Sequence, residues 1–470
     1  MRTRFISFAV LCLASACVTN PVTHNSELAT VSQSGEIKMG RDVDRYLVAT
    51  RRFYDDSAWE RYVQQLGLRL AAKCERPELP WTFRVLDDPG VNAFALPGGF
   101  VYVTRGMLVY LNSEAQLAAV LGHEVGHVAA RHAVGQRTRQ EMAGLGLMVA
   151  TVAGSMTAGY AGSAGLQVLF LANSRAAEQQ ADELGLRYMS DAGYDPTEMQ
   201  AALRTIERVV EAGRLPGWLA THPPWERRLE NIQLERGVLQ SNGTLVERDA
   251  YLAHLNRLAF GIDERQGYFK GSRFAVPARG YQVTFPRGWL RSSDGAAVRV
   301  ESLAQDAVVE LTTTEQPSVD SASRFFFAKL AKLEGSPTHD QINGFTVVSA
   351  SFTWLPLWVK MRGSVKFIEH RGTVYRVMGY ARSSRWSAYR EVVESALGTF
   401  ELIPEAELQR AEPLRVATLS LAGPTSLTAL AKARPSPVEL TELAGLNQVA
   451  PDSVLPAGRV IKWVVGTLYH

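Results

Sequence analysis

Two histidines and a glutamate stand at the spacing of a catalytic zinc site. The segment His123-Glu124-Val125-Gly126-His127 has the form HExxH. On an α-helix, residues four apart lie on the same face one turn apart, so His123 and His127 can bind one metal ion. Glu124 projects to the side, where it can reach a metal-bound water and act as general base. The alternative, a pair of solvated histidines on a surface helix, is disfavoured by the motif.

The residues around the motif predict the helix that must carry it. Ser113 followed by Gln116 resembles a capping box, and Glu114 adds negative charge to the first turn, so the helix is expected to begin here. Four apolar residues then fall on one arc that would face a core: Leu117, Leu121, Val125 and Val128. Because the histidines lie away from this arc, we expect them to line the edge of a cleft rather than a packed interior.

A second helical segment offers a third ligand. Glu178 and Asp182 are four residues apart and therefore share one face of the predicted helix. A metal held by two histidines and one glutamate keeps a fourth position open, as catalysis requires. Asp182 suits a position behind the metal, where it would accept a hydrogen bond from the outer ring nitrogen of a ligating histidine. The alternative for Glu178 is an ordinary solvated helix face.

Three blocks in order carry a resemblance to a known family. They are HEVGHVAARH, SRAAEQQADELGLRYMSDAGYDP and THPPWERRL. From about Glu36 to Glu235 the chain resembles the gluzincin metallopeptidase family that includes the CAAX prenyl proteases, the HtpX-like proteases and the beta-barrel assembly-enhancing proteases. The resemblance implies that His123, His127 and Glu178 bind one zinc ion per chain, with Glu124 as general base and Asp182 behind the ligands.

The resemblance also assigns residues that would contact the substrate. His222 and Arg228 match the family's His-Pro block, and either could donate to the oxyanion of a tetrahedral intermediate. In the family this histidine can also become a fourth zinc ligand and block the site; the alternative for His222 is a turn residue. Asn92 and Ala93 begin a segment similar to the family's edge strand, which pairs with an extended substrate, although Asn92 could equally be a turn asparagine.

The first residues are typical of an export signal. Arg2 and Arg4 precede an apolar run, Phe5 to Ala16, that is too short to span a bilayer. Residues 13–17 resemble a bacterial lipoprotein box, so we expect a signal peptide over 1–16 and lipidation of Cys17. This predicts a lipid-anchored protein on the periplasmic face of the outer membrane. The alternative is a plain signal peptide cut near Ala16.

Composition and pattern predict an α+β chain of several domains. We expect a zincin-like, mostly helical peptidase domain with a small sheet over residues 17–262, and an α+β sheet domain of unknown role over 263–403. We expect a small β-α-α-β domain resembling a lysin motif over 404–470. Within 263–403, residues 321–333 and 386–397 have helical patterns. The uncharged stretch 142–174 favours a flap over a membrane hairpin because it is rich in glycine.

The predicted function is zinc-dependent endoproteolysis of misfolded or misassembled envelope proteins. The alternative is a chaperone-like scaffold lipoprotein that keeps zinc for stability. The lysin-motif-like tail suggests contact with peptidoglycan or, alternatively, a structural cap, since Pro424 replaces the motif's usual aspartate. The formal net charge is +3 and would become +1 without Arg2 and Arg4, which does not favour binding of nucleic acid.

Overall fold

The computed structural model describes most of the chain and groups its contacts into two compact units. The described residues are 17–28, 30–49, 53–138, 173–211, 222, 228–238, 243–261, 267–293, 297–355, 359–408 and 412–467. One unit runs to Gly261 and includes Leu414–Val465, and the other covers Ile262–Pro413. Each unit contains helices and antiparallel strand pairs, so the predicted α+β class is confirmed.

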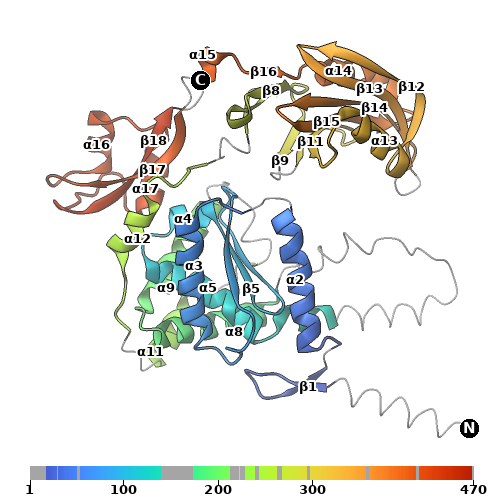
Figure 1. The fold of residues 1–470 in the computed structure, drawn as a ribbon. Helices are drawn as coiled ribbons and strands as arrows, with labels where there is room; N and C mark the ends of the chain where they lie inside the picture. The colour runs from blue at the N-terminus through green and yellow to red at the C-terminus, as the bar shows by residue number, and fades with distance from the viewer. Residues whose placement is uncertain are drawn as a thin grey trace, which may run out of the picture. The chain divides into compact units, whose positions relative to one another are not determined.

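The first unit packs helices around a three-stranded sheet of order β3-β5-β4 (Figure 1). In this sheet β3 and β5 are parallel, β4 and β5 are antiparallel, and β4 is an edge strand. A short strand pair, β1 (Cys17–Thr19) and β2 (Ser26–Leu28), precedes it. The elements up to Gly261 are α2 (Gln33–Ala49), α3 (Ser57–Ala71), β3 (Thr82–Leu86), β4 (Ala93–Leu96), β5 (Phe100–Thr104), α4 (Arg105–Tyr110), α5 (Glu114–Ala129), α8 (Arg175–Asp191), α9 (Thr197–Glu211), α11 (Arg228–Val238) and α12 (Arg248–Leu255).

Helix α5 begins where the sequence predicts. The Ser113 hydroxyl accepts a hydrogen bond from the backbone N–H of Gln116, as an N-cap does. The Gln116 side chain, however, accepts from the N–H of Asn112 at 2.7 Å, one residue before the cap. Every residue of α5 is buried, because α3, α8, α9 and the sheet all pack against it. Both histidines are buried, against the expectation that they lie outside the packed interior, although His127 does line a cleft as expected.

Helices α5 and α8 approach each other closely enough to require small residues at the crossing. A Cβ added to Gly185 of α8 would lie 2.7 Å from the backbone nitrogen of His123, and one added to Gly122 would lie 3.0 Å from the Gly185 carbonyl oxygen. Real Cβ atoms do not approach backbone atoms this closely without displacement. The glycines thus set the separation of the two helices that carry the predicted ligands.

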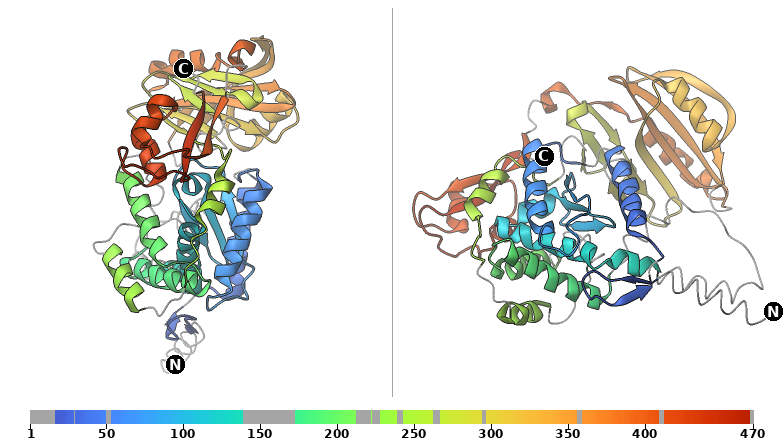
Figure 2. Two further views of the ribbon diagram at one scale, coloured as in Figure 1. Left: turned by 90° about the vertical axis from the view of Figure 1, so that its left-hand side faces the viewer. Right: turned by 60° about the horizontal axis from the view of Figure 1, so that its bottom comes forward.

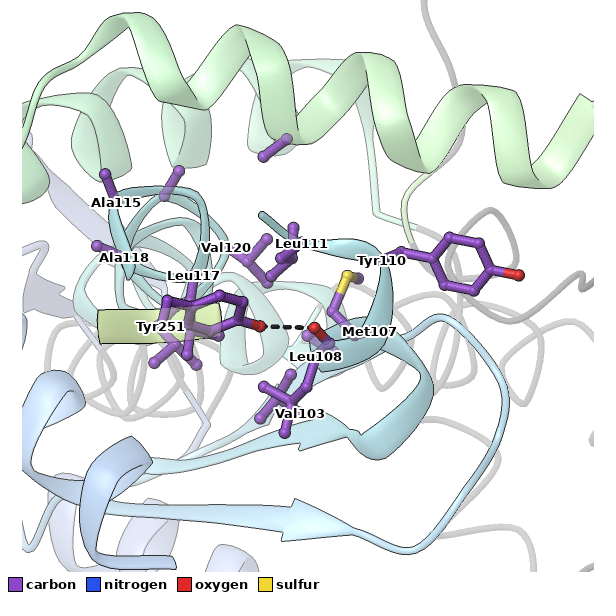
Figure 3. Packing of buried hydrophobic residues seen from close by; sticks show 14 of the residues in the cluster. Val103, Met107, Leu108, Tyr110, Leu111, Ala115, Leu117, Ala118, Val120 and Tyr251 are labelled. Atoms are coloured by element: carbon purple, nitrogen blue, oxygen red, sulfur yellow. Dashed lines mark hydrogen bonds between the residues drawn. The ribbon is translucent and has the colours of Figure 1, made fainter. Parts of the chain in front are cut away.

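Apolar side chains around α4 and the start of α5 form the core next to the sheet (Figure 3). Tyr251 of α12 reaches into this core and donates its hydroxyl hydrogen to the carbonyl oxygen of Leu108 at 2.6 Å. A buried hydroxyl needs such a partner to offset its desolvation. This hydrogen bond connects α12 to α4, which directly precedes α5.

The C-terminal segment belongs to the first unit. It comprises β17 (Glu412–Ser420), α16 (Leu427–Ala433), α17 (Leu440–Asn447) and β18 (Val460–Thr467), with β17 paired to β18. In Figures 1 and 2 this segment, drawn in red, lies against the helices of the same unit. The fully buried Lys462 donates from its side-chain nitrogen to the carbonyl oxygens of Val109 and Leu111, at 2.6 and 2.9 Å. The tail therefore contacts the backbone just before α5.

The second unit is built on a seven-stranded antiparallel sheet of order β12-β13-β14-β15-β11-β10-β9 and a four-stranded sheet of order β16-β8-β7-β6. Buried side chains form two separate apolar clusters in this unit. Its elements are β6 (Tyr268–Lys270), β7 (Arg273–Val276), a 3₁₀ turn (Pro277–Arg279), β8 (Tyr281–Thr284), β9 (Leu290–Ser293), β10 (Ala297–Glu301), β11 (Ala307–Thr314), α13 (Val319–Lys329), β12 (Lys332–Ile342), β13 (Phe345–Trp354), β14 (Met361–His370), β15 (Thr373–Arg382), α14 (Trp386–Leu397), β16 (Glu401–Leu402) and α15 (Glu405–Leu408).

Several expectations about membranes and export fall on residues that the structure leaves undescribed. The predicted signal peptide, 1–16, lies outside the described residues, as does most of the 142–174 stretch. Among the helices that the structure does describe, none has both the length and the apolar character needed to cross a bilayer.

Candidate metal centre

Four buried side chains bring possible metal ligands to one point. One ligand atom from each of His123, His127, Glu178 and His222 lies within 4.8 Å of all the others. The Nε2 atoms of His123 and His127 are 3.0 Å apart, and they lie 3.5 and 3.4 Å from the two Glu178 carboxylate oxygens. Donors placed about 2.0–2.1 Å from a tetrahedral ion would be about 3.3 Å from each other. The two helices therefore already hold these donors at the separation that one ion needs.

The Glu178 carboxylate supports a bound cation at this point. Both of its oxygens are buried and have no hydrogen-bond partner among the described residues, and the side chain is 0% exposed. A buried carboxylate without compensation is costly, and a cation supplies that compensation. Two imidazole nitrogens with one carboxylate are typical of catalytic zinc, whereas calcium and magnesium prefer oxygen ligands alone. The residues present therefore fit zinc.

Burial and neighbouring charges act in opposite directions on Glu178. Burial alone raises the pKa of this carboxyl, but the neighbouring His222, His123 and His127 outweigh it and hold the pKa well below its usual range. The carboxylate is therefore ionised at neutral pH, as a zinc ligand must be.

Asp182 and Arg228 hold His123 from behind. The Asp182 oxygen Oδ1 lies 2.8 Å from Nδ1 of His123, and Arg228 binds both oxygens of Asp182, each at 2.8 Å. Arg228 is the first residue of α11, and its Nη2 is 3.8 Å from a Glu178 oxygen. Arg228 thus contacts Asp182, the residue behind His123, and its role toward a substrate stays a prediction.

His127 has an outer partner that the sequence does not predict. Its Nδ1 lies 2.8 Å from Nδ1 of His132, whose Nε2 lies 3.0 Å from the Oε1 atom of Gln180. Burial lowers the pKa of His132 to about 3, so this ring is neutral at physiological pH. The available signal was the third histidine of the HEVGHVAARH block, but a spacing of five residues after His127 does not by itself place the two rings together.

Glu124 lies beside the donors without joining them. It is 1% exposed, its Oε1 is 3.4 Å from Nε2 of His222, and the backbone N–H of Ala95 on β4 donates to its carboxylate. Burial raises the pKa of Glu124 to about 8. A carboxyl with a pKa near neutrality can both take up and release a proton, which is the property of a general acid and base.

The cleft over the site is lined differently from the prediction. Phe94, Ala95, Leu96 and Pro97 line it together with Glu124, His127 and His222, whereas the described lining does not include Asn92 or Ala93. Ala93 is fully buried, and the backbone of Asn92 is bound to Thr104. The edge strand is therefore where the sequence predicts, but the part of it facing the metal donors lies two residues further along.

Comparison with known proteins gives matches over the same part of the chain. The model of "Peptidase family M48" matches residues 57–236. The beta-barrel assembly-enhancing protease of Yersinia pestis is 30% identical over 249 residues, which are 50% of this chain and 51% of that protein. That of Escherichia coli K12 is 28% identical over 52% of this chain and 53% of its own length.

Two further comparisons involve more distant proteins. The mitochondrial metalloendopeptidase OMA1 of Schizosaccharomyces pombe is 28% identical over 45% of this chain and 64% of its own length. A solved structure, the cyanobacterial PsbP protein CyanoP from Synechocystis, matches 29% of this chain and 96% of its own at 16% identity and a TM-score of 0.24. The chain spans about half the length of the beta-barrel assembly-enhancing proteases that it matches.

The family match and the donor geometry agree with the resemblance seen in the sequence blocks. The matched residues contain both helices of the metal site, with His123, His127 and Glu178. The predicted zinc-metallopeptidase resemblance is thereby confirmed, while the lysin-motif-like tail stays a prediction. Residues 57–236 of this chain match the model of peptidase family M48.

Proposed function

We propose that the protein is a zinc-dependent endopeptidase. The observation that carries the proposal is the convergence of His123, His127 and Glu178, with Glu124 next to them and outside the ligand set. A purely structural zinc site would need no such glutamate. Glu124 is therefore what favours an enzyme over a zinc-stabilised scaffold, the alternative function for this chain.

Zinc bound at this site would polarise the scissile carbonyl and acidify a water molecule near it. Glu124 takes the proton from the attacking water and passes it to the leaving amine, for which its burial beside the donors suits it. We assign His222 as a donor to the developing oxyanion, which is supported by its ring centroid lying 5.1 and 5.3 Å from those of His123 and His127. In the absence of substrate the same ring can occupy the fourth ligand position.

The edge strand β4 suits an extended polypeptide substrate. It pairs with β5 on one side, and no described strand pairs with its other side. An exposed strand edge binds peptides through backbone hydrogen bonds, so it reads an extended conformation more than a particular sequence. Recognition of this kind fits proteins with unfolded segments as substrates.

We propose envelope proteins as the substrates, on the basis of the names of the matched relatives. The matched bacterial proteins are named beta-barrel assembly-enhancing proteases. An export signal over 1–16 and a lipid anchor at Cys17 would place this chain at the periplasmic face of the outer membrane. Labelled palmitate should enter the wild-type protein but not Cys17→Ala; equal labelling, or none in either, would count against the anchor.

The proposal is tested by hydrolysis of casein with the full chain. Cleavage should stop with a chelator and return with added zinc. Glu124→Gln should keep zinc and reduce the rate by about 10²- to 10⁴-fold or more, because only the proton transfer is removed. Glu78→Gln, an exposed position, is the matched control and should cleave at the wild-type rate. Unchanged cleavage by Glu124→Gln would remove the assignment, and zinc-loaded protein that never cleaves would favour the scaffold.

A further inference from the structure

The two histidine ligands are supported from behind by different chemistry. His123 faces the carboxylate of Asp182, whose charge is balanced by Arg228. On the outer side of His127 the described residues place no carboxylate. Its Nδ1 is 2.8 Å from Nδ1 of His132, a residue that follows α5, and His132 continues to Gln180 of α8 at 3.0 Å. The series of hydrogen-bonded side chains behind His127 therefore ends at the neutral amide of Gln180.

Zinc binding to His127 fixes the direction of both hydrogen bonds in the series His127, His132 and Gln180. A ligating imidazole uses the lone pair of one nitrogen and carries its proton on the other. Nε2 of His127 faces Glu178 and His123, so its proton must be on Nδ1, which donates to Nδ1 of His132. Because Nδ1 of His132 accepts this hydrogen bond, the ring proton of His132 is on Nε2, which donates to the Gln180 carbonyl oxygen.

The opposite direction of the hydrogen bonds would prevent binding. If the Gln180 amide were reversed, its NH₂ group would donate to Nε2 of His132, whose proton would then be on Nδ1. His132 would donate to Nδ1 of His127 and leave the proton of that ring on Nε2, where zinc must bind. The orientation of the Gln180 amide is thus coupled to whether His127 presents a lone pair to the metal.

We propose that His132 and Gln180 are positioning residues that hold His127 in its metal-binding tautomer through an uncharged relay. The inference rests on the zinc site of the proposed function. It adds that the two histidine ligands are positioned independently. The ion pair of Asp182 with Arg228 positions His123, whereas His132 and Gln180 position His127. Removal of either member of the relay should weaken zinc binding without removing a ligand.

The test measures zinc affinity of the full chain by competition with a chromogenic chelator. His132→Phe and Gln180→Leu should each lower the affinity by about 10- to 100-fold, the usual effect of losing a partner behind a metal ligand. The double variant should bind zinc no more weakly than the weaker-binding of the two single variants, because the two residues act in series. Gln180→Glu keeps an acceptor and should retain most of the affinity. His254→Phe is the matched control, since His254 is exposed and stacks on Tyr62 away from the site.

A spectroscopic readout separates positioning from simple packing. In ¹⁵N NMR spectra of the zinc-loaded wild type, the ring proton of His127 should be on Nδ1 and that of His132 on Nε2. Thermal unfolding without zinc shows whether each variant folds, and Gln180→Leu provides the test should His132→Phe not fold. A proton on Nδ1 of His132, or unchanged affinity in Gln180→Leu, would overturn the relay alone. A wild type that binds no zinc would overturn the proposed function as well.

Discussion

Arg228 and Asp182 form an ion pair that is buried on both sides, with side-chain exposures of 6% and 3%. The contact is bidentate, and Asp182 also faces His123. Loss of one partner from such a pair leaves the other charge buried without compensation. The pair is therefore the residue-level contact whose removal should affect both the fold and the metal site.

Arg228→Met should lower the free energy of unfolding by about 3–5 kcal/mol, because the Asp182 carboxylate would stay buried without its cation. Urea denaturation measured by circular dichroism checks this. Arg362→Met is the matched control: its pair with Glu334 has side-chain exposures of 50% and 31%, so the loss should be about 1 kcal/mol or less. Similar losses in the two variants would show that burial does not govern the strength of this contact.

The ligands could be predicted from the sequence, but their supporting partners only in part. The HExxH spacing brings two histidines to one helix face by helix geometry alone, and Glu178 with Asp182 follows the same rule. Asp182 was expected behind a histidine, and the structure places it there. The contacts of His132 with His127, and of Arg228 with Asp182, depend on how separate segments meet, which no local spacing reveals.

Helices α5 and α8 form the element pair on which the ligand geometry depends. The two helices are in close backbone contact at Gly185. A Cβ atom added to Gly185 would lie 2.9 Å from the Cα atom of His123. Backbone atoms cannot rotate away as a flexible side chain can. Any side chain at this position must therefore separate the helix with His123 and His127 from the helix with Glu178.

Gly185→Ala should destabilise the protein by about 1–3 kcal/mol, because the strain of overpacking exceeds the gain of up to about 1 kcal/mol from alanine's helix propensity. It should also weaken zinc binding. Gly237→Ala in α11 is the control and should raise the stability, since an added Cβ there meets nothing within 4 Å. Thermal unfolding of the two variants checks both signs, and a Gly185→Ala protein as stable as Gly237→Ala would contradict the proposed role of the crossing.

The sequence predicted elements well where apolar residues repeat and less well where they do not. The helical pattern assigned to residues 321–333 is a helix only from Val319 to Lys329, and the predicted end of the helix is wrong because β12 begins at Lys332. Residues of β12 are mostly exposed and polar, so the strand carries no alternating apolar signal. It forms by backbone pairing with β13, an interaction that composition does not encode.

In the molecule as a whole, the C-terminal tail belongs to the same unit as the metal site. Contacts from α17 and the residue that follows it reach the start of α5 and the loop before it: Asn112 donates to the Leu446 carbonyl oxygen at 2.9 Å, and Gln448 donates to Gln116 at the same distance. The self-contained β-α-α-β pattern of residues 404–470 predicts a separate domain for the tail. Contacts between segments more than 300 residues apart leave no trace in such a pattern.

Lys462→Met should lower the free energy of unfolding of the first unit by about 1–3 kcal/mol, because the carbonyl groups of Val109 and Leu111 would stay buried without a donor. Lys432→Met, at an exposed position of α16, is the matched control and should change little. Hydrogen exchange of the full chain locates the effect, with faster exchange expected at the start of α5. Equal stability of the two variants would show that the tail does not support the metal helix.

The account depends on His123, His127 and Glu178 holding a single zinc ion, and the zinc content of the purified full chain tests this most directly. After dialysis against dilute zinc and then zinc-free buffer, elemental analysis should find one zinc ion per chain in the wild type and in Glu124→Gln. His123→Ala, His127→Ala and Glu178→Ala should each retain far less. A wild type without zinc, or ligand variants that keep it in full, would contradict the account.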